Sequence, residues 1–510
     1  MKKLNPLRTG VVLSYINLLI GNLIPFFYTP IMLRILGQEE YGLYTIANSV
    51  VSYLSLLNFG IGSSIIRYIA AYRAEGNQEE ERRLLGLFVT IYSIIGILII
   101  VVGTTLAFNI EIFYGNTLSA EEVNTLRILI ILLSISMGLV MPLNVFASLI
   151  MAHEKYILSG IVRIVSSLLS PILNLVVLFL GWRSIGLVAS SSALSIGVNV
   201  IYCIYAISRL KLIPIFKGWS GKLLKEILYY SFFHFLASIV DMLYWNTDKL
   251  LLGAMVGTVA VAVYNIGAMF HTYTQSIATS ISSVLMPRVT KMFVDQVDSS
   301  AYTELFIRVG RMQYLLVGFI VSAFCIFGQQ FIMLWSGPGY EQAYWVAILV
   351  LLPSVVPWIQ NTGLQILTAQ NMHKFRSIVY FFIALLNVVL TYLWIKTNGI
   401  IGAAAASGVA YIIGQGFVMN WYYWKKIGID IPKFWKVIAK MFFYTIAVSA
   451  VWFVITHTIF VISNIWEFLV GAVLYSISYF IVAYRFMMND YEKDFIRKPL
   501  STIRNKFLKK

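Results

Sequence analysis

Long apolar runs, interrupted by charged residues, glycine or proline, follow one another along almost the whole chain. A helix crosses the hydrocarbon of a bilayer in about 20 apolar residues, whereas a transmembrane β-strand needs about 10 with strict alternation. The apolar runs have the length of transmembrane helices, and the interruptions between them predict fourteen helical spans. The predicted spans are 11–33, 41–66, 84–108, 126–151, 157–180, 184–207, 223–247, 250–285, 305–334, 342–369, 375–396, 399–424, 434–458 and 461–486. The pattern therefore predicts an all-α polytopic membrane protein.

Composition and charge support a membrane protein and indicate how the chain is oriented in the membrane. Of 510 residues, 59% are hydrophobic and 12% are charged, against about 45–50% and about 25% in soluble proteins. The 38 Lys and Arg residues outnumber the 22 Asp and Glu residues, which gives a net charge of +16. With both termini in the cytoplasm, 33 of the 38 cations lie on the cytoplasmic side, as the positive-inside rule requires. The excess thus indicates membrane lipids as neighbours and no nucleic-acid partner.

The loops and motifs argue against an enzyme. Every predicted outer loop is short, and the sequence contains no P-loop, no Gly-rich dinucleotide turn, no HExxH and no nucleophile elbow. The five histidines are scattered without metal-ligand spacing, and the two cysteines lie inside apolar runs. We expect no metal site, no cofactor and a transport function.

Short sequence similarities at offsets of about 215–220 residues indicate an internal repeat. Gly37–Ala47 resembles Gly257–Gly267, since in both a glycine precedes a tyrosine by seven residues, and Ile185–Ala189 resembles Ile401–Ala405. An even number of spans per repeat makes the two lobes parallel. The predicted division is an N-terminal six-helix lobe (1–210), a C-terminal six-helix lobe (211–426), helices 13 and 14 (427–488), and a basic cytoplasmic tail (489–510).

Polar side chains recur on one face of four predicted spans. Ionisable groups inside spans are costly and usually face a bundle interior or a water-filled cavity. Two prolines, Pro25 and Pro30, interrupt the first span and are candidate gating points. The candidate cleft residues are Arg34, Asn48, Asn58, His234, Asp241, Asp248, Lys249, His271 and Gln275.

Structural roles compete with the cleft assignment for several of these residues. Asp248 and Lys249 lie at the predicted end of a span, where a charged pair can simply anchor the helix at the interface. His234 is also compatible with a hydrogen-bonded packing role, and Arg34 with a side chain that snorkels to the outer interface.

Fourteen spans in a 6+6+2 arrangement carry LGxxxYGxY at Leu36–Tyr44, NTDKLLLG at Asn246–Gly253, VGxxxxxxYN at Val256–Asn265 and NGIIGAAAAS at Asn398–Ser407. In these features the chain resembles the polysaccharide (Wzx-type, lipid-linked oligosaccharide) flippase family. That family is part of the multidrug/oligosaccharidyl-lipid/polysaccharide exporter superfamily. The similarity extends over nearly the whole chain, although its motifs are short and shared among relatives.

The resemblance implies a flippase of the bacterial plasma (inner) membrane. Its substrate would be an undecaprenyl-diphosphate-linked oligosaccharide repeat unit for lipopolysaccharide O-antigen or capsule, moved from the cytoplasmic to the outer leaflet by alternating access. It implies a central cleft lined by spans 1, 2, 7 and 8, and polysaccharide polymerase machinery as a partner. Cations would hold the diphosphate, with Arg34 and Lys249 in the outer half and Arg67 or Arg288 at the inner mouth.

Such flippases frequently have basic cavities, whereas span 7 of this chain contains two aspartates. Asp241 and Asp248 are candidates for binding H⁺ or Na⁺ and coupling transport to an ion gradient. The same residues fit a cation-coupled multidrug exporter of the same fold. A non-transport membrane component of polysaccharide synthesis is a third hypothesis.

Overall fold

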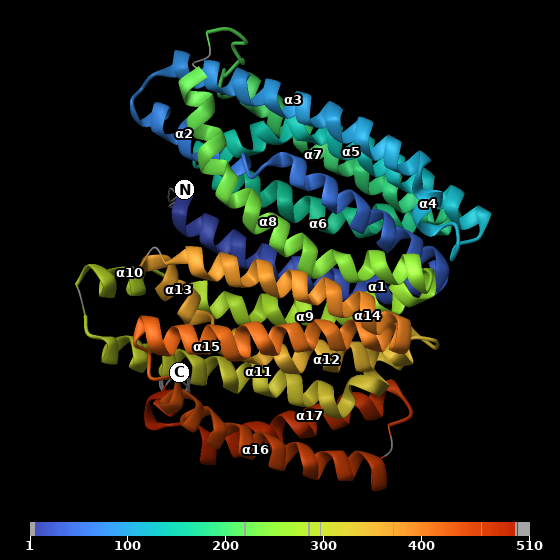
Figure 1. Ribbon diagram of the computed structural model, residues 1–510, viewed down its shortest axis with the longest axis vertical. Coiled ribbons are helices and arrows are strands. Elements are labelled where there is room, and N and C mark those ends of the chain that lie inside the picture. The colour runs from blue at the N-terminus through green and yellow to red at the C-terminus, as the bar shows by residue number, and fades with distance from the viewer. Residues whose placement is uncertain are drawn as a thin grey trace, which may run out of the picture. The chain divides into compact units, whose positions relative to one another are not determined.

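The computed structural model describes residues 6–218, 221–283, 286–295, 297–370, 372–460, 462–494 and 497, which form helices joined by short turns (Figure 1). No β-strand occurs among these residues, so the predicted all-α fold is confirmed. Ten of the described helices are long and apolar enough to cross a membrane. Two of the ten each correspond to two predicted spans: Phe375–Ile427 contains both of its spans, and Leu19–Asn58 contains most of 11–33 and of 41–66. The helices α8 (Gly221–Met255) and α9 (Thr258–Ser283) cover two more, so fourteen spans fit the structure.

Contacts between helices divide the chain into two units, which comprise Met1–Asn265 with Ile395–Ile400 and Ile266–Trp394 with Ile401–Lys510. The first unit contains α1 (Pro6–Leu54), η1 (Ser55–Asn58), α2 (Gly62–Ala74), α3 (Gln78–Phe108), α4 (Ile110–Tyr114), α5 (Ala120–Ala152), α6 (Tyr156–Phe179), α7 (Arg183–Ser208), α8 and the start of α9. The sequence repeat divides the chain at 210/211, before α8. In the structure α8 packs against α1, α2 and α4, so the contact boundary falls after this helix.

The second unit contains the rest of α9 and most of α14. Its other helices are α10 (Met286–Val294), α11 (Ser299–Ser336), α12 (Glu341–Ile359), α13 (Asn361–Ala369), α14 (His373–Tyr411), α15 (Met419–Tyr422), α16 (Ile431–Thr458) and α17 (Ile465–Val482), with π-helical turns η2 (Ile412–Val418), η3 (Tyr423–Ile427) and η4 (Ala483–Met487). Helix α11 packs against α12, α13, α16 and α17, so it forms the centre of this unit.

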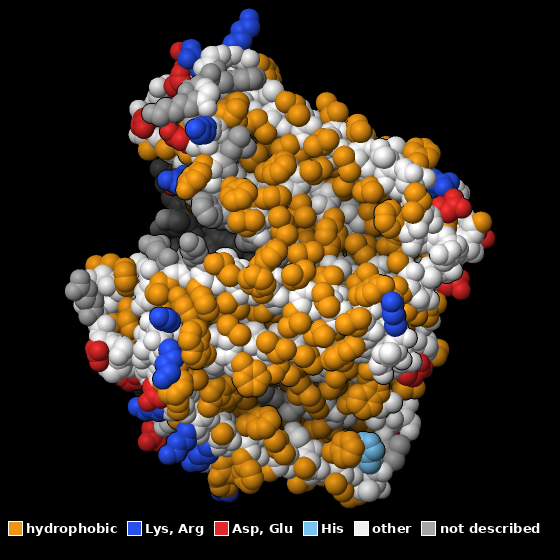
Figure 2. Space-filling model, viewed as in Figure 1, with side chains coloured by type: hydrophobic (Ala, Val, Ile, Leu, Met, Phe, Trp, Pro, Cys, Tyr) orange, Lys and Arg blue, Asp and Glu red, His pale blue; other side chains and the backbone are white. Residues whose placement is uncertain are grey.

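Large apolar side chains cover the outside of the helices in both units. Figure 2 shows hydrophobic side chains along the helix flanks and charged side chains near the helix ends. Phe27, Phe179 and Phe443 are among the exposed large hydrophobic residues. Exposed apolar surface of this extent is stable when lipid, and not water, surrounds the helices. The chain is therefore a multi-pass membrane protein.

Small residues permit a close helix contact in the first unit, between α3 and α5. A Cβ atom on Gly96 would lie 2.3 Å from the Gly138 carbonyl oxygen, and one on Gly138 would lie 2.6 Å from the Gly96 carbonyl oxygen. Both distances are far below van der Waals contact, so only glycine fits at this crossing. Close backbone approach through small residues is a general means of helix association in membranes.

Two predicted span boundaries are wrong. The charged pair Asp248–Lys249 marked the end of a span in the sequence, but α8 continues to Met255 and the turn lies at Gly257, whose φ is +117°. The predicted span 41–66 instead gives way to a turn at Phe59 and Gly60, both with positive φ, and the separate helix α2 begins at Gly62. In both places hydrophobic residues continue through a backbone turn, so the hydrophobic pattern does not predict where the turn lies.

A side-chain contact that recurs in both units corresponds to the sequence repeat. In the first unit, the Ser190 and Ser191 hydroxyls of α7 donate to Oδ1 of Asn174 in α6 at 2.7 and 3.1 Å. In the second, the Ser407 hydroxyl donates to Oδ1 of Asn387 at 3.2 Å. Ser407 lies at the same position after Ile401-Gly402 as Ser191 after Ile185-Gly186. The same asparagine–serine contact thus joins corresponding helices of the two repeats.

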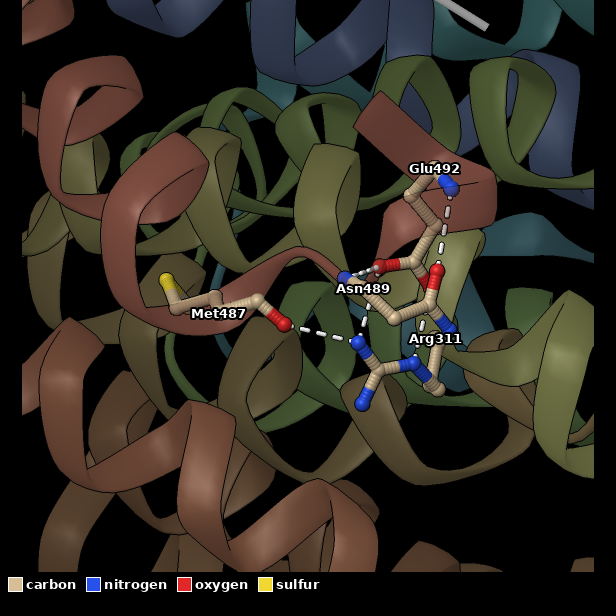
Figure 3. Close-up of polar contacts among 4 residues, drawn as sticks. All are labelled: Arg311, Met487, Asn489 and Glu492. Atoms are coloured by element: carbon tan, nitrogen blue, oxygen red, sulfur yellow. Dashed lines mark hydrogen bonds and ion pairs between the residues drawn. The ribbon is translucent and has the colours of Figure 1, made fainter. Parts of the chain in front are cut away.

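A buried ion pair fixes the segment after α17 to α11. The Arg311 guanidinium donates to both carboxylate oxygens of Glu492 at 2.7 and 2.8 Å and to the Met487 carbonyl at 2.7 Å (Figure 3). Asn489 and Glu492 also exchange two backbone–side-chain hydrogen bonds, each of 2.9 Å. The side chains of Arg311 and Glu492 are 12% and 3% exposed. Both charges are therefore desolvated and depend on each other.

The variant Arg311→Met is expected to lower the free energy of unfolding by about 3–5 kcal/mol, because it leaves the Glu492 charge buried without its cation. Thermal unfolding of the purified protein in detergent measures the loss. The double variant Arg311→Met/Glu492→Leu should recover part of the stability. Glu79→Gln is the control, since its exposed pair with Arg83 contributes about 0.3–0.5 kcal/mol. Equal effects of Arg311→Met and Glu79→Gln would contradict this account.

Candidate functional site

A row of hydrogen bonds joins the end of α8 and the start of α9 to α1 in the first unit. The Tyr53 hydroxyl lies 2.5 Å from the Thr247 hydroxyl, and Nδ2 of Asn265 donates to the Tyr41 hydroxyl at 2.7 Å. Between them, the Tyr264 hydroxyl donates to the Asp248 carboxylate. We call these residues the polar seam: Tyr41, Tyr53, Thr247, Asp248, Tyr264 and Asn265. It connects three helices through side chains that would be costly in lipid.

Asp248 is the most buried member of the seam, with 1% of its surface exposed. A carboxylate in such a place costs several kcal/mol unless donors surround it. The Tyr264 hydroxyl supplies one donor from across the α8–α9 turn. The structure therefore places Asp248 inside the packed unit, where it holds the hairpin together.

Asp241 lies two helical turns before Asp248 on α8 and has an exposed side chain. Arg34 of α1 is also exposed, and Lys249 is half-buried. Since an exposed carboxylate on a membrane-spanning helix is tolerated where water reaches it, Asp241 indicates a hydrated surface on α8. Among the predicted cleft residues, Asp241 and Arg34 are thus accessible, whereas Asp248 is not.

The remaining candidates of the first unit have mainly local contacts. Nδ2 of Asn48 donates to the Tyr44 carbonyl one turn earlier at 2.7 Å, and Asn58 is half-buried at the end of η1. Pro25 and Pro30 both lie inside α1, where each removes a backbone hydrogen bond. The predicted gating role of the two prolines is compatible with this placement and stays a prediction.

The exposed Arg67 lies on α2, with its guanidinium 5.9 Å from the Tyr68 ring centroid. The side chains of Arg288 and His234, the other two candidates, lie outside the described residues. Within the described ranges, no group of three or more His, Cys, Asp or Glu residues is placed to hold a metal.

His271 and Gln275 belong to the second unit. His271 is 0% exposed, with its ring centroid 5.0 Å from that of Trp358 and 6.1 Å from that of Tyr411. Gln275 lies one turn further along α9 and is half-buried. The structure thus places His271 in an aromatic cluster of the packed interior, although it shares a helix face with Tyr264 in the sequence.

Sequence reasoning missed the partners of Asp248 and of the α8–α9 hairpin. Tyr264 and Asn265 stand in the motif at Val256–Asn265, and Tyr41 stands in the motif at Leu36–Tyr44, but neither motif states what the side chains contact. A tyrosine that follows an aspartate by sixteen residues gives no signal until the turn between them is known. Thr247 stands in the motif at Asn246–Gly253, again without a stated contact, and Tyr53 had no signal at all.

The variant Tyr264→Phe is expected to lower the free energy of unfolding by about 1.5–3 kcal/mol, the usual contribution of a hydrogen bond to a charged group. A double-mutant cycle with Asp248→Asn, measured by thermal unfolding, should give a coupling energy of at least about 1 kcal/mol. Lys225→Gln on the same helix is the control, since its side chain is exposed, and it should leave stability unchanged. Additive effects of the two seam variants would contradict a direct Asp248–Tyr264 interaction.

Comparisons with known proteins agree with this architecture. Over residues 7–293 the chain matches the family described as "Polysaccharide biosynthesis protein". It is 22% identical over 410 residues to a putative O-antigen transporter of Shigella flexneri, which covers 76% of this chain and 91% of that relative. It is 23% identical over 387 residues to the uncharacterized membrane protein EpsK of Bacillus subtilis (strain 168), covering 71% and 72%.

Solved structures share the fold at low sequence identity. The lipid II flippase MurJ, in an inward closed conformation, aligns with a TM-score of 0.75 and 17% identity over 93% of this chain and 98% of its own. A multidrug resistance MATE family transporter in an inward-facing conformation aligns with a TM-score of 0.63 and 15% identity over 84% and 99%. The family match includes α1, α2, α8 and α9, the helices that carry the candidate residues. By this match over more than half of its length, the chain belongs to the polysaccharide biosynthesis protein family of membrane proteins.

Proposed function

We propose that this protein is a flippase that moves an undecaprenyl-diphosphate-linked oligosaccharide from the cytoplasmic to the outer leaflet of a bacterial plasma membrane. The observation that carries the proposal is the family match over residues 7–293, which contains all of the candidate residues. A relative described as a putative O-antigen transporter covers most of the chain and supports a sugar-containing cargo. Both termini lie in the cytoplasm in this proposal.

The chemistry of the cargo explains why a membrane protein must carry it. A diphosphate and several sugars lose their hydration in hydrocarbon, whereas the prenyl chain is stable there. A hydrated polar path for the head group, with the prenyl chain left in lipid, satisfies both parts. Arg34 and Asp241 have exposed side chains on helices of the first unit, as such a path requires.

Cationic side chains would hold the diphosphate during this movement. Arg34 suits the role because its guanidinium offers several donors in a plane that matches phosphate oxygens. Lys249 and Arg67 are further candidates, Lys249 in the outer half of the path and Arg67 at its cytoplasmic mouth. Asp241 would bind H⁺ or Na⁺ and couple the cycle to an ion gradient.

Cells in which the gene is disrupted should lose surface polysaccharide and accumulate lipid-linked oligosaccharide, because the cargo remains in the inner leaflet. Arg34→Gln should fail to restore surface polysaccharide at equal protein levels. Lys396→Gln is the matched control, since Lys396 is another exposed cation of the predicted outer side. Quantitative mass spectrometry of extracted lipids measures the accumulation. Full restoration of surface polysaccharide by Arg34→Gln would contradict a role of Arg34 in binding the substrate.

A cation-coupled multidrug exporter is the second candidate, favoured by the exposed carboxylate of Asp241 and by the fold shared with a multidrug transporter. In that case the disrupted strain would be hypersensitive to cationic dyes and would accumulate no lipid-linked oligosaccharide. Dye efflux from vesicles would be lost in Asp241→Asn and kept in Arg34→Gln. A non-transport role in polysaccharide synthesis would instead leave export intact in the double variant Asp241→Ala/Arg34→Ala.

A further inference from the structure

Three lysines lie on one side of α16, in the first half of this helix. Lys433, Lys436 and Lys440 follow one another at intervals of three and four residues, so they share one helix face, and all three are exposed. We call this surface the lysine face. The opposite side of α16 carries the buried residues Phe434 and Ile438, and α16 packs against α11. The lysine face therefore points away from the packed second unit.

The lysine face continues into a surface that lipid covers. Phe443 follows Lys440 by three residues and Lys436 by seven, and its side chain is 67% exposed. Lys436 and Lys440 lie inside the predicted span 434–458. Ionisable groups inside spans usually face a bundle interior or a water-filled cavity. These two lysines instead share a face with an exposed phenylalanine, so their natural counter-ion is an anionic group of the lipid.

The protein itself does not balance the charges of the lysine face. None of the three lysines forms an ion pair with a described Asp or Glu residue. The carboxylate of Asp430, the N-cap of α16, accepts from the Lys433 backbone amide at 2.9 Å, and the first turn contains no acidic residue. Cations near a helix N-terminus are disfavoured by the helix dipole. Both the dipole and the lysines therefore favour an anion at this end of α16.

The direction of the lysine side chains suits a headgroup near the start of the helix. In an α-helix the Cα–Cβ bonds tilt toward the N-terminus, so the side chains on α16 lean toward Ile431. Lys440 lies nine residues further on, a rise of about 13.5 Å. Its apolar stem can run along the helix surface and carry the ammonium group back toward the interface. The three ammonium groups are thus able to approach one anionic headgroup.

Aromatic side chains border the lysine face on the side of the next helix. Tyr444, one turn after Lys440, stacks on Phe486 of η4, with the ring centroids 5.4 Å apart and the planes at 20°. Phe486 is itself exposed. Figure 2 shows Lys and Arg side chains beside hydrophobic ones at the end of the second unit where Figure 1 marks the C-terminus. Aromatic rings are frequent at headgroup depth, where they contact both headgroups and acyl chains.

We propose that the lysine face of α16 is a binding site for an anionic phospholipid, whose phosphate is held by the ammonium groups and whose acyl chains lie along the exposed aromatic side chains. A zwitterionic phospholipid carries its own cation beside the phosphate and binds less tightly. The proposed function places this end of α16 in the cytoplasm, where anionic lipids attract basic segments. The site lies outside residues 7–293, over which the family match extends, and does not depend on the cargo.

Native mass spectrometry of the full chain in a neutral detergent tests the lipid preference. Phosphatidylglycerol should remain bound at lower concentration than phosphatidylcholine. One lysine near an anionic lipid surface contributes about fivefold in affinity, so Lys433→Gln/Lys436→Gln/Lys440→Gln should weaken phosphatidylglycerol binding at least about tenfold. Equal binding of the two lipids by the unaltered protein would overturn the proposal.

The matched control is Lys155→Gln/Lys211→Gln/Lys217→Gln. It removes the same charge from three exposed lysines that are also predicted to lie on the cytoplasmic side, but that share no helix face. This variant should bind phosphatidylglycerol as the unaltered protein does. Equal weakening by the two triple variants would show a general effect of net charge and would overturn a site on α16.

A second measurement locates the lipid on the unaltered protein. In nanodiscs, phosphatidylglycerol in place of phosphatidylcholine should slow acetylation of Lys433, Lys436 and Lys440 by an impermeant reagent about fivefold relative to Lys155 and Lys217. Mass spectrometry of the digested protein gives the rate at each lysine. Equal slowing at all five lysines, or the same protection by inorganic phosphate without the lipid, would overturn the proposal. Selective protection in a protein that moves no oligosaccharide would contradict the proposed function and leave the lipid site intact.

Discussion

A polar group on a membrane-spanning helix has no water to bind, so each one needs a partner in the protein or a hydrated surface. In this chain that constraint separates the candidate residues into two kinds. Asp248, Tyr264 and Thr247 find partners across a helix contact and become part of the packing. Asp241 and Arg34 remain exposed and mark surface that water must reach.

The buried polar groups also explain why the contacts of α8 place it with the N-terminal helices. The sequence repeat, in contrast, predicts that α8 belongs to the C-terminal lobe. Hydroxyl and amide hydrogen bonds join the α8–α9 hairpin to α1, and each contributes about 0.5–1.5 kcal/mol. Contacts of this kind are specific in geometry and modest in energy. They differ from the buried Arg311–Glu492 pair, in which two desolvated charges depend on each other.

Most of the fold was predictable from the sequence because apolar runs of about 20 residues determine where helices cross a bilayer. The boundary at Asp248–Lys249 was wrong for a physical reason, since a charged pair looks like a helix end unless the partner of the carboxylate is known. That partner, Tyr264, lies beyond a turn that depends on the positive φ of Gly257. Helical periodicity groups residues by face, but it does not state what the face contacts. His271 shows this limit, because the aromatic cluster that encloses it comes from distant helices.

Transport by the purified chain alone is the most direct test of the central claim. Lipid-linked oligosaccharides extracted from the disrupted host strain are incorporated into both leaflets of sealed vesicles, and an impermeant glycosidase is added outside. Without the protein, about half of the sugar is protected, since it faces the interior. The account predicts that vesicles containing the protein lose this protected fraction while remaining sealed to a trapped dye. A protected fraction that persists, across both signs of a proton and a sodium gradient, would contradict it.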